Sequence, residues 1–130
     1  MKRLLLTLLL AVMSSSAMAE WVEVGVNDDG ATVYANPDTI RRAGKRTKMW
    51  SLVDYKTAQV IAGELYMSRT SLHEYDCKDE QHRILSASFY SKNMRRGNTV
   101  ATESNRNSGK WAPNPPDTVA ESLWKFACEK

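Results

Sequence analysis

The chain has 130 residues, of which 42% are hydrophobic and 25% charged, and its formal net charge at pH 7 is +3. Lys2 and Arg3 supply two of the 18 basic residues, so the rest of the chain holds 16 basic against 15 acidic residues, a net charge of +1. Such a small excess excludes a general electrostatic attraction for nucleic acid and leaves only local clusters of charge to interpret.

Residues 1–19 have the pattern of a secretory signal peptide. The two basic residues precede an apolar run from Leu4 to Met13, and Ala17-Met18-Ala19 matches an A-x-A cleavage site. The apolar run is shorter than the roughly 20 residues of a membrane span, and no second one follows. We therefore expect export, without a transmembrane segment, of a single domain of residues 20–130. Its first residue is Glu20, not the Cys that would carry a lipid anchor.

The exported part is predicted to form about six strands and one helix. Alternation of apolar and polar residues, bounded by turn residues, predicts strands at residues 21–26, 31–35, 45–55, 65–77, 83–92 and 98–104. Asp29-Gly30 predicts a hairpin between the first two strands. We expect a single helical turn at residues 38–42, closed by Gly44, a loop at 56–59 and a second loop at 105–116.

A C-terminal helix is predicted for residues 117–130. Thr118 and Glu121 form a capping box, and the apolar side chains after them fall on one arc of the helix. A helix of about three turns does not stand alone in water, so we expect it to lie on one face of the sheet. Cys77 and Cys128 are the only cysteines, and in an exported chain they are expected to form one disulfide. The predicted fold class is α+β, an antiparallel meander sheet with one helix packed on a face and tied by that bond.

No catalytic constellation is apparent, and we expect no enzymatic activity. His73, Asp76, Cys77 and His82 form a set that could hold zinc. We favour instead a disulfide for the thiol and surface positions for the histidines, and expect no metal. Acidic residues crowd two turns, where carboxylates commonly cap the backbone, although an acid–base pair is the alternative.

A cluster of basic residues is the better candidate for function. Five positive charges fall within eight residues: Arg41, Arg42, Lys45, Arg46 and Lys48. Such a cluster suits acidic protein segments or sulfated glycans. The alternative is a solvated turn that protects a sheet edge from aggregation. A smaller group, Arg95 and Arg96, lies in the last predicted hairpin turn.

Several short motifs follow one another in order along residues 20–130. They are Tyr34-Ala35-Asn36-Pro37-Asp38-Thr39-Ile40 with Arg41, Arg42 and Gly44; Met49-Trp50-Ser51-Leu52 with Asp54-Tyr55-Lys56-Thr57; Tyr75-Asp76-Cys77 before Arg83; Phe89-Tyr90-Ser91 to Gly97-Asn98; Trp111; and the helix from Glu121 to Cys128. This ordered set resembles the surface-adhesin protein E family of exported bacterial proteins. The resemblance implies a six-stranded antiparallel sheet whose C-terminal helix is tied by a disulfide, here between Cys77 and Cys128.

The resemblance also implies a function. The name-giving member of the family is a lipid-anchored outer-membrane adhesin that binds host matrix and serum proteins such as vitronectin, laminin and plasminogen. It has also been linked to haem and to dimerisation, so haem and a homodimer are implied here by resemblance alone. We expect an exported, non-enzymatic binding protein that is periplasmic, associated with the outer membrane or secreted. The alternative is a soluble periplasmic envelope protein, structural or ligand-binding, with no host partner.

Overall fold

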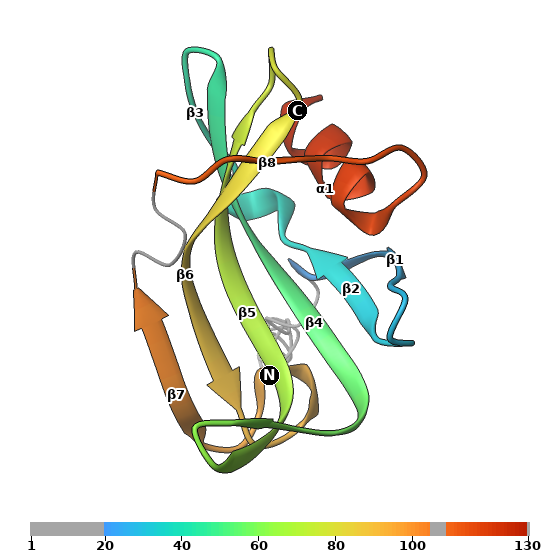
Figure 1. Cartoon of the computed structure of the whole chain (residues 1–130), viewed down its shortest axis with the longest axis vertical. Coiled ribbons are helices and arrows are strands. Elements are labelled where there is room, and N and C mark those ends of the chain that lie inside the picture. The colour runs from blue at the N-terminus through green and yellow to red at the C-terminus, as the bar shows by residue number, and fades with distance from the viewer. Residues whose placement is uncertain (1–19, 105–108, 130) are drawn as a thin grey trace, which may run out of the picture.

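The computed structural model describes residues 20–104 and 109–129 and shows one curved antiparallel sheet with a helix at one end (Figure 1). The predicted signal peptide, residues 1–19, lies outside the described residues. The elements are β1 (Val22–Val26), β2 (Thr32–Ala35), a 3-10 turn (Pro37–Thr39), β3 (Arg41–Ala43), β4 (Arg46–Ile61), β5 (Glu64–Asp76), β6 (Gln81–Tyr90), a second 3-10 turn (Asn93–Arg95), β7 (Thr99–Ser104), β8 (Ala112–Pro113) and α1 (Val119–Cys128).

The strands form an antiparallel meander. Their order is β1-β2-β4-β5-β6-β7, with short β3 paired to β4 and two-residue β8 paired to β6. The loop expected at residues 105–116 is therefore wrong at Ala112–Pro113, and its residues 105–108 lie outside the described residues. The predicted α+β class and the six-strand meander are confirmed. No helix among the described residues is long and apolar enough to span a membrane.

The segment after Asn36 differs from the prediction. The Asn36 side-chain oxygen accepts a hydrogen bond from the Asp38 N–H at 3.1 Å and caps a turn that ends at Thr39, so the helical turn expected at residues 38–42 is wrong in its second half. Gly44 has a φ of +66°, which glycine adopts at little cost and which reverses the chain at once. Arg41–Ala43 therefore pair with β4 as a strand.

Strand β4 is longer than predicted, because the loop expected at residues 56–59 is part of it. The ladder between β4 and β5 continues to Ile61 and absorbs the extra residues in an irregularity between Asp54 and Gln59. The extra residues of this irregularity, 55–58, belong to β4. Ala62 and Gly63 both have positive φ, as a two-residue hairpin turn requires, so pairing persists up to the turn.

Helix α1 covers one face of the sheet at the end that carries the β3–β4 hairpin (Figure 1). Thr118 Oγ1 accepts a hydrogen bond from the Glu121 N–H at 3.2 Å, and the Glu121 carboxylate reaches back to the Asp117 N–H at 3.0 Å. The helix buries Leu123 and Ala127 against a core of Ala31, Val33, Ala35, Met49, Val53 and Tyr75. This burial confirms that the apolar arc of the helix faces the sheet.

The end of α1 is tied to the end of β5. Cys77 and Cys128 form the predicted disulfide, with their Cα atoms 5.6 Å apart. Next to it, Trp124 Nε1 donates a hydrogen bond to the Asp76 carbonyl at 2.9 Å. Since side chains alternate along β4, Met49 and Val53 point to this helix face, while Arg46, Lys48 and Trp50 point to the opposite one, called the far face below.

Candidate functional site

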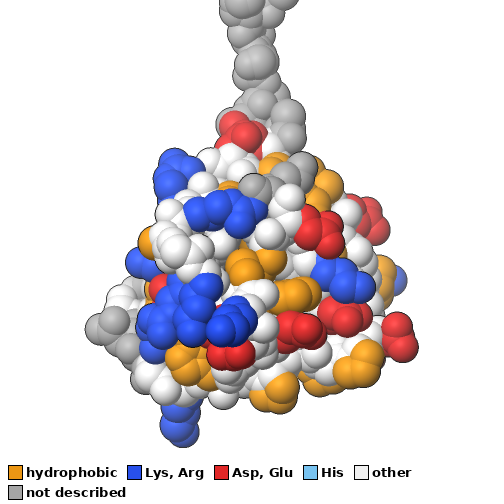
Figure 2. Space-filling model, turned by 90° about the horizontal axis from the view of Figure 1, so that it is seen from above, with side chains coloured by type: hydrophobic (Ala, Val, Ile, Leu, Met, Phe, Trp, Pro, Cys, Tyr) orange, Lys and Arg blue, Asp and Glu red, His pale blue; other side chains and the backbone are white. Residues whose placement is uncertain are grey.

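The five predicted cations all lie on the β3–β4 hairpin, and all are exposed. Arg41 is directly opposite Lys48, and Ala43 is opposite Arg46. Directly opposite residues share a face of the sheet, as do residues two apart, so Arg41, Arg46 and Lys48 lie together on the far face. Seen from this end of the molecule, Lys and Arg side chains gather on one side (Figure 2).

Arg42 and Lys45 have structural contacts instead. Both terminal nitrogens of Arg42 donate to the Cys128 carbonyl at 3.4 Å, where a positive charge also complements the C-terminal end of the helix. Lys45 Nζ lies 3.9 Å from a carboxylate oxygen of Asp76. The Asp79 N–H lowers the pKa of Asp76, and Lys45 adds to this effect. These two cations therefore help to hold α1 and the end of β5 in place.

The remaining three cations form what we call the basic ridge: Arg41, Arg46 and Lys48. Among the described residues no carboxylate forms an ion pair with any of them. Arg41 donates only to carbonyls of its own turn, Asp38 at 3.2 Å and Ile40 at 2.8 Å. The ridge thus presents three exposed charges without a salt bridge, although Arg46 is directly opposite Asp76, whose pKa it helps to lower, and Lys48 is directly opposite Glu74.

An aromatic ring borders the ridge. Trp111 lies against two guanidinium groups, with its ring centroid 5.2 Å from Arg46 Cζ and 4.5 Å from Arg83 Cζ. Arg83 is neutralised by Glu74, at 2.7 Å between Nη2 and Oε1. Cation–π contact fixes Arg46 in place without removing its charge. No local sequence pattern marks Trp111 or Arg83 as a site residue, because only the path of residues 109–113 back along β6 brings Trp111 to Arg83 and the hairpin.

The histidines do not form a surface site. The expectation of surface histidines is wrong for His73, whose Nδ1 is buried without a hydrogen-bond partner. Its ring stacks on Tyr75 with centroids 5.6 Å apart and lies 5.5 Å from His82. Burial lowers the pKa of His73 to about 3, with further lowering by His82 and Arg69. His73 is therefore neutral at physiological pH, and its ring is partly buried against Tyr75 and His82.

His82 links the segment between β8 and α1 to the sheet. Its Nδ1 lies 2.6 Å from Asn114 Oδ1, just beyond β8. The described residues contain no group of three His, Cys, Asp or Glu side chains that could hold a metal ion. The set of His73, Asp76, Cys77 and His82 is thus divided between core packing, the disulfide and the turn that Asp76 caps.

The fold is shared with crystal structures of protein E from Haemophilus influenzae. One structure has a TM-score of 0.66 at 13% sequence identity, covering 85% of each chain. Crystal form II has the same score at 12% identity, covering 85% of this chain and 88% of that one. Protein E from a non-typeable strain has a TM-score of 0.56 at 12% identity, covering 88% and 76%.

Sequence comparison agrees with this likeness. No curated protein sequence matches the chain at a significant level. A family model described as surface-adhesin protein E, however, matches residues 21–129, nearly all of the part that the structure describes. The chain therefore belongs to the surface-adhesin protein E family.

Proposed function

We propose that this chain is an exported, non-enzymatic surface adhesin, and that its basic ridge contacts acidic segments of host matrix and serum proteins or sulfated glycans. Residues 1–19 serve as the signal peptide in this proposal, and residues 20–130 act as one binding domain. Family membership supports the adhesin class. The observation that carries the site is the set of three exposed, unpaired cations on one strand pair, Arg41, Arg46 and Lys48.

The ridge is suited to long-range attraction. Exposed charges raise association rates and lose strength as salt is added, since the screening length is about 8 Å at physiological ionic strength. Individual exposed ion pairs contribute about 0.2–1 kcal/mol, so three of them together correspond to roughly 10- to 100-fold in affinity at the upper part of that range. A partner with clustered sulfates or carboxylates can engage all three at once.

The test is a charge-matched pair of variants. In the ridge variant Arg41, Arg46 and Lys48 are replaced by Gln; in the control, three exposed cations elsewhere, Lys56, Lys78 and Arg96, are replaced in the same way. Binding to heparin and to immobilised vitronectin, laminin and plasminogen is measured at low and physiological salt. We expect a loss of about tenfold or more in the ridge variant only. An equal loss in both variants would show that net charge alone matters, and no loss in either would remove the ridge from the proposal.

Accessibility on cells tests the adhesin class. An adhesin must be open to protease or antibody added to intact cells. We expect the chain to be cleaved or labelled there. Detection only after the outer membrane is opened would refute the adhesin proposal and favour the periplasmic envelope protein.

A further inference from the structure

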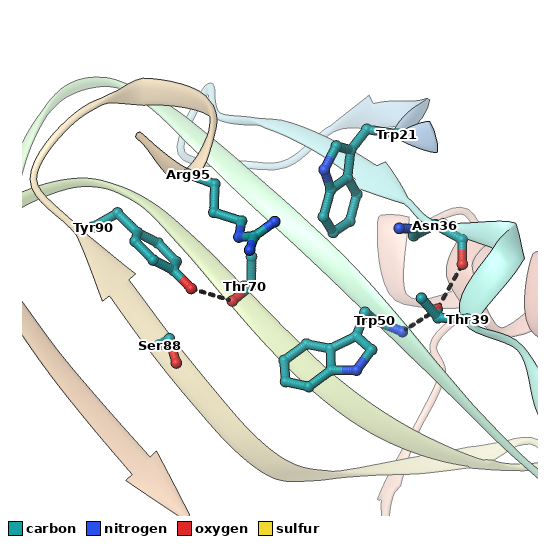
Figure 3. Close-up of a pocket in the computed structure, with 8 residues that line it drawn as sticks. All are labelled: Trp21, Asn36, Thr39, Trp50, Thr70, Ser88, Tyr90 and Arg95. Atoms are coloured by element: carbon teal, nitrogen blue, oxygen red, sulfur yellow. Dashed lines mark hydrogen bonds between the residues drawn. The ribbon is translucent and has the colours of Figure 1, made fainter. Parts of the chain in front are cut away.

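A cavity of about 230 Å³ opens on the far face of the sheet (Figure 3). It begins at Trp50, the next far-face residue of β4 after Lys48 of the basic ridge. Its floor is formed by side chains of β4, β5 and β6: Trp50, Thr70, Ser88 and Tyr90. Its walls come from Trp21, just before β1, and from two connections, with Asn36 and Thr39 between β2 and β3 and Arg95 between β6 and β7.

The floor is fixed by strand register. Thr70 is directly opposite Ser88, and the Thr70 Oγ1 and Tyr90 Oη atoms lie 3.5 Å apart. The wall at the β2–β3 connection is tied to the same floor, because Thr39 Oγ1 accepts a hydrogen bond from the Trp50 N–H at 3.0 Å. The cavity is therefore a formed feature of the fold.

The loop that carries Arg95 is held in an uncommon backbone conformation. Met94 and Arg95 have φ values of 54° and 64°, a region that non-glycine residues rarely adopt and that costs on the order of 1 kcal/mol each. The Asp54 carboxylate compensates by accepting from the Met94 N–H at 2.7 Å and from Asn93 Nδ2 at 3.1 Å. Ser68 Oγ accepts from the Arg95 N–H at 2.9 Å. These contacts direct the Arg95 guanidinium over the cavity (Figure 3).

The cavity is aromatic, cationic and rich in hydrogen-bond donors. Two indole rings and a phenol supply flat apolar surface, and the described lining includes no carboxylate. The Asn36 side-chain oxygen is already used by Asp38, which leaves its NH2 group to donate. Burial alone would raise the pKa of Tyr90, but hydrogen bonds with Thr70, Arg95 and Ser88 bring it below the ordinary value.

We propose that this cavity binds one carboxylated pyranose, an acidic sugar either free or at the end of a glycan. The C–H faces of a pyranose ring are weakly positive and pack on the negative faces of Trp21 and Trp50. Its hydroxyl groups pair with Ser88 and Asn36, and its carboxylate forms a charge-assisted bond with Arg95. A volume below the roughly 300–1,000 Å³ of drug-sized sites suits a single ring.

Other small ligands fit this set of groups less well. A neutral sugar leaves the Arg95 guanidinium without its anion. An aromatic acid stacks and pairs with Arg95 but offers no hydroxyl groups to the Asn36 amide and Ser88. A small inorganic anion leaves the indole surfaces in water.

The cavity and the basic ridge form one strip of surface. Arg46, Lys48 and Trp50 are successive far-face residues of β4, so a glycan whose terminal acidic sugar occupies the cavity would continue along the ridge. This extension rests on the proposed function of the ridge. Binding of a single acidic sugar in the cavity does not.

The experiment compares two neighbouring arginines in the mature chain. Arg95→Gln removes the charge at the cavity and keeps the backbone contact to Ser68, while Arg96→Gln removes an exposed charge that does not line the cavity. Calorimetry and tryptophan fluorescence measure binding of glucuronic acid, N-acetylneuraminic acid, glucose and benzoate. We expect the sugar acids to bind most tightly, and to bind at least tenfold more weakly to Arg95→Gln but not to Arg96→Gln.

The opposite outcomes are equally clear. Any of four results would overturn the inference. Glucose could bind as tightly as glucuronic acid, benzoate could bind most tightly, both variants could lose the same affinity, or no sugar acid could bind at all. A hyaluronan tetrasaccharide, which carries glucuronate, separates the cavity from the ridge. The Arg41, Arg46 and Lys48 variant should bind free glucuronic acid normally and lose only the additional affinity of the tetrasaccharide. If the wild type bound the tetrasaccharide no more tightly than free glucuronic acid, the result would count against the ridge but not against binding of the acidic sugar in the cavity.

Discussion

Removal of the Cys77–Cys128 disulfide should cost the protein a large part of its stability. The bond joins residues 51 positions apart. In the chain-entropy model, a loop of that length contributes about 4 kcal/mol, against a total of about 5–15 kcal/mol for a typical domain. Helix α1 has only ten residues and depends on its contacts with the sheet. Without the bond, burial of Leu123 and Ala127 and the hydrogen bond of Trp124 must hold it.

The perturbation is the double variant Cys77→Ala/Cys128→Ala, which leaves no free thiol. Unfolding in urea, followed by tryptophan fluorescence, should give a free energy of unfolding lower by about 4 kcal/mol. The melting temperature should fall by roughly 15–20 °C, given an unfolding entropy of about 2.1 cal/mol/K per residue. Wild type measured with the disulfide reduced should show the same loss. Unchanged midpoints in both the variant and the reduced protein would refute the reasoning, and a loss in the variant alone would assign the effect to side-chain packing.

Two further predictions concern the core. Because the folded chain holds His73 neutral with a pKa of about 3 against an ordinary 6.5, the unfolded state binds the extra proton between these values. The stabilisation from keeping His73 neutral is complete above pH 6.5 and is lost as pH falls. Between pH 7 and 5 the free energy of unfolding should therefore drop by about 2 kcal/mol more in wild type than in His73→Phe, and equal drops in urea titrations would contradict this. Leu123, only 7% exposed, should lower the free energy of unfolding by about 2–4 kcal/mol when replaced by Ala. The control Leu65→Ala, at a residue 61% exposed, should change it by no more than about 0.5 kcal/mol. Similar urea midpoints for the two variants would show that α1 does not pack as described.

Local patterns were sufficient for the elements whose signals lie within a few residues. Asp29-Gly30 predicted the β1–β2 hairpin, and Thr118 with Glu121 predicted the start of α1; both are present. Where the prediction was wrong, at Arg41–Arg42 and residues 56–59, the segment is polar and has no apolar alternation. Whether such a segment pairs depends on the strand beside it, which the local sequence does not contain.

The basic cluster is a second case in which the sequence located the residues but strand pairing decided their arrangement. Its position in the chain was evident, but the register of β3 against β4 separates Arg41, Arg46 and Lys48 from Arg42 and Lys45. Side chains alternate between faces, so a one-residue shift of β3 would place Arg42 instead of Arg41 on the face of Arg46 and Lys48. The sequence also could not show that Arg42 would reach the end of a helix 86 residues away.

The sequence by itself determined the composition of this protein's fold: antiparallel strands, one capped amphipathic helix and a pair of cysteines to join them. These follow from residue periodicity, turn chemistry and redox compartment, which act over short distances or on the chain as a whole. Only the tertiary structure decided which charges have no salt bridge, that the His73 ring packs against Tyr75 and His82, and that Trp21, Trp50 and Arg95 surround one cavity. Such neighbours come from strands and connections far apart in the chain, and strand pairing alone brings them together.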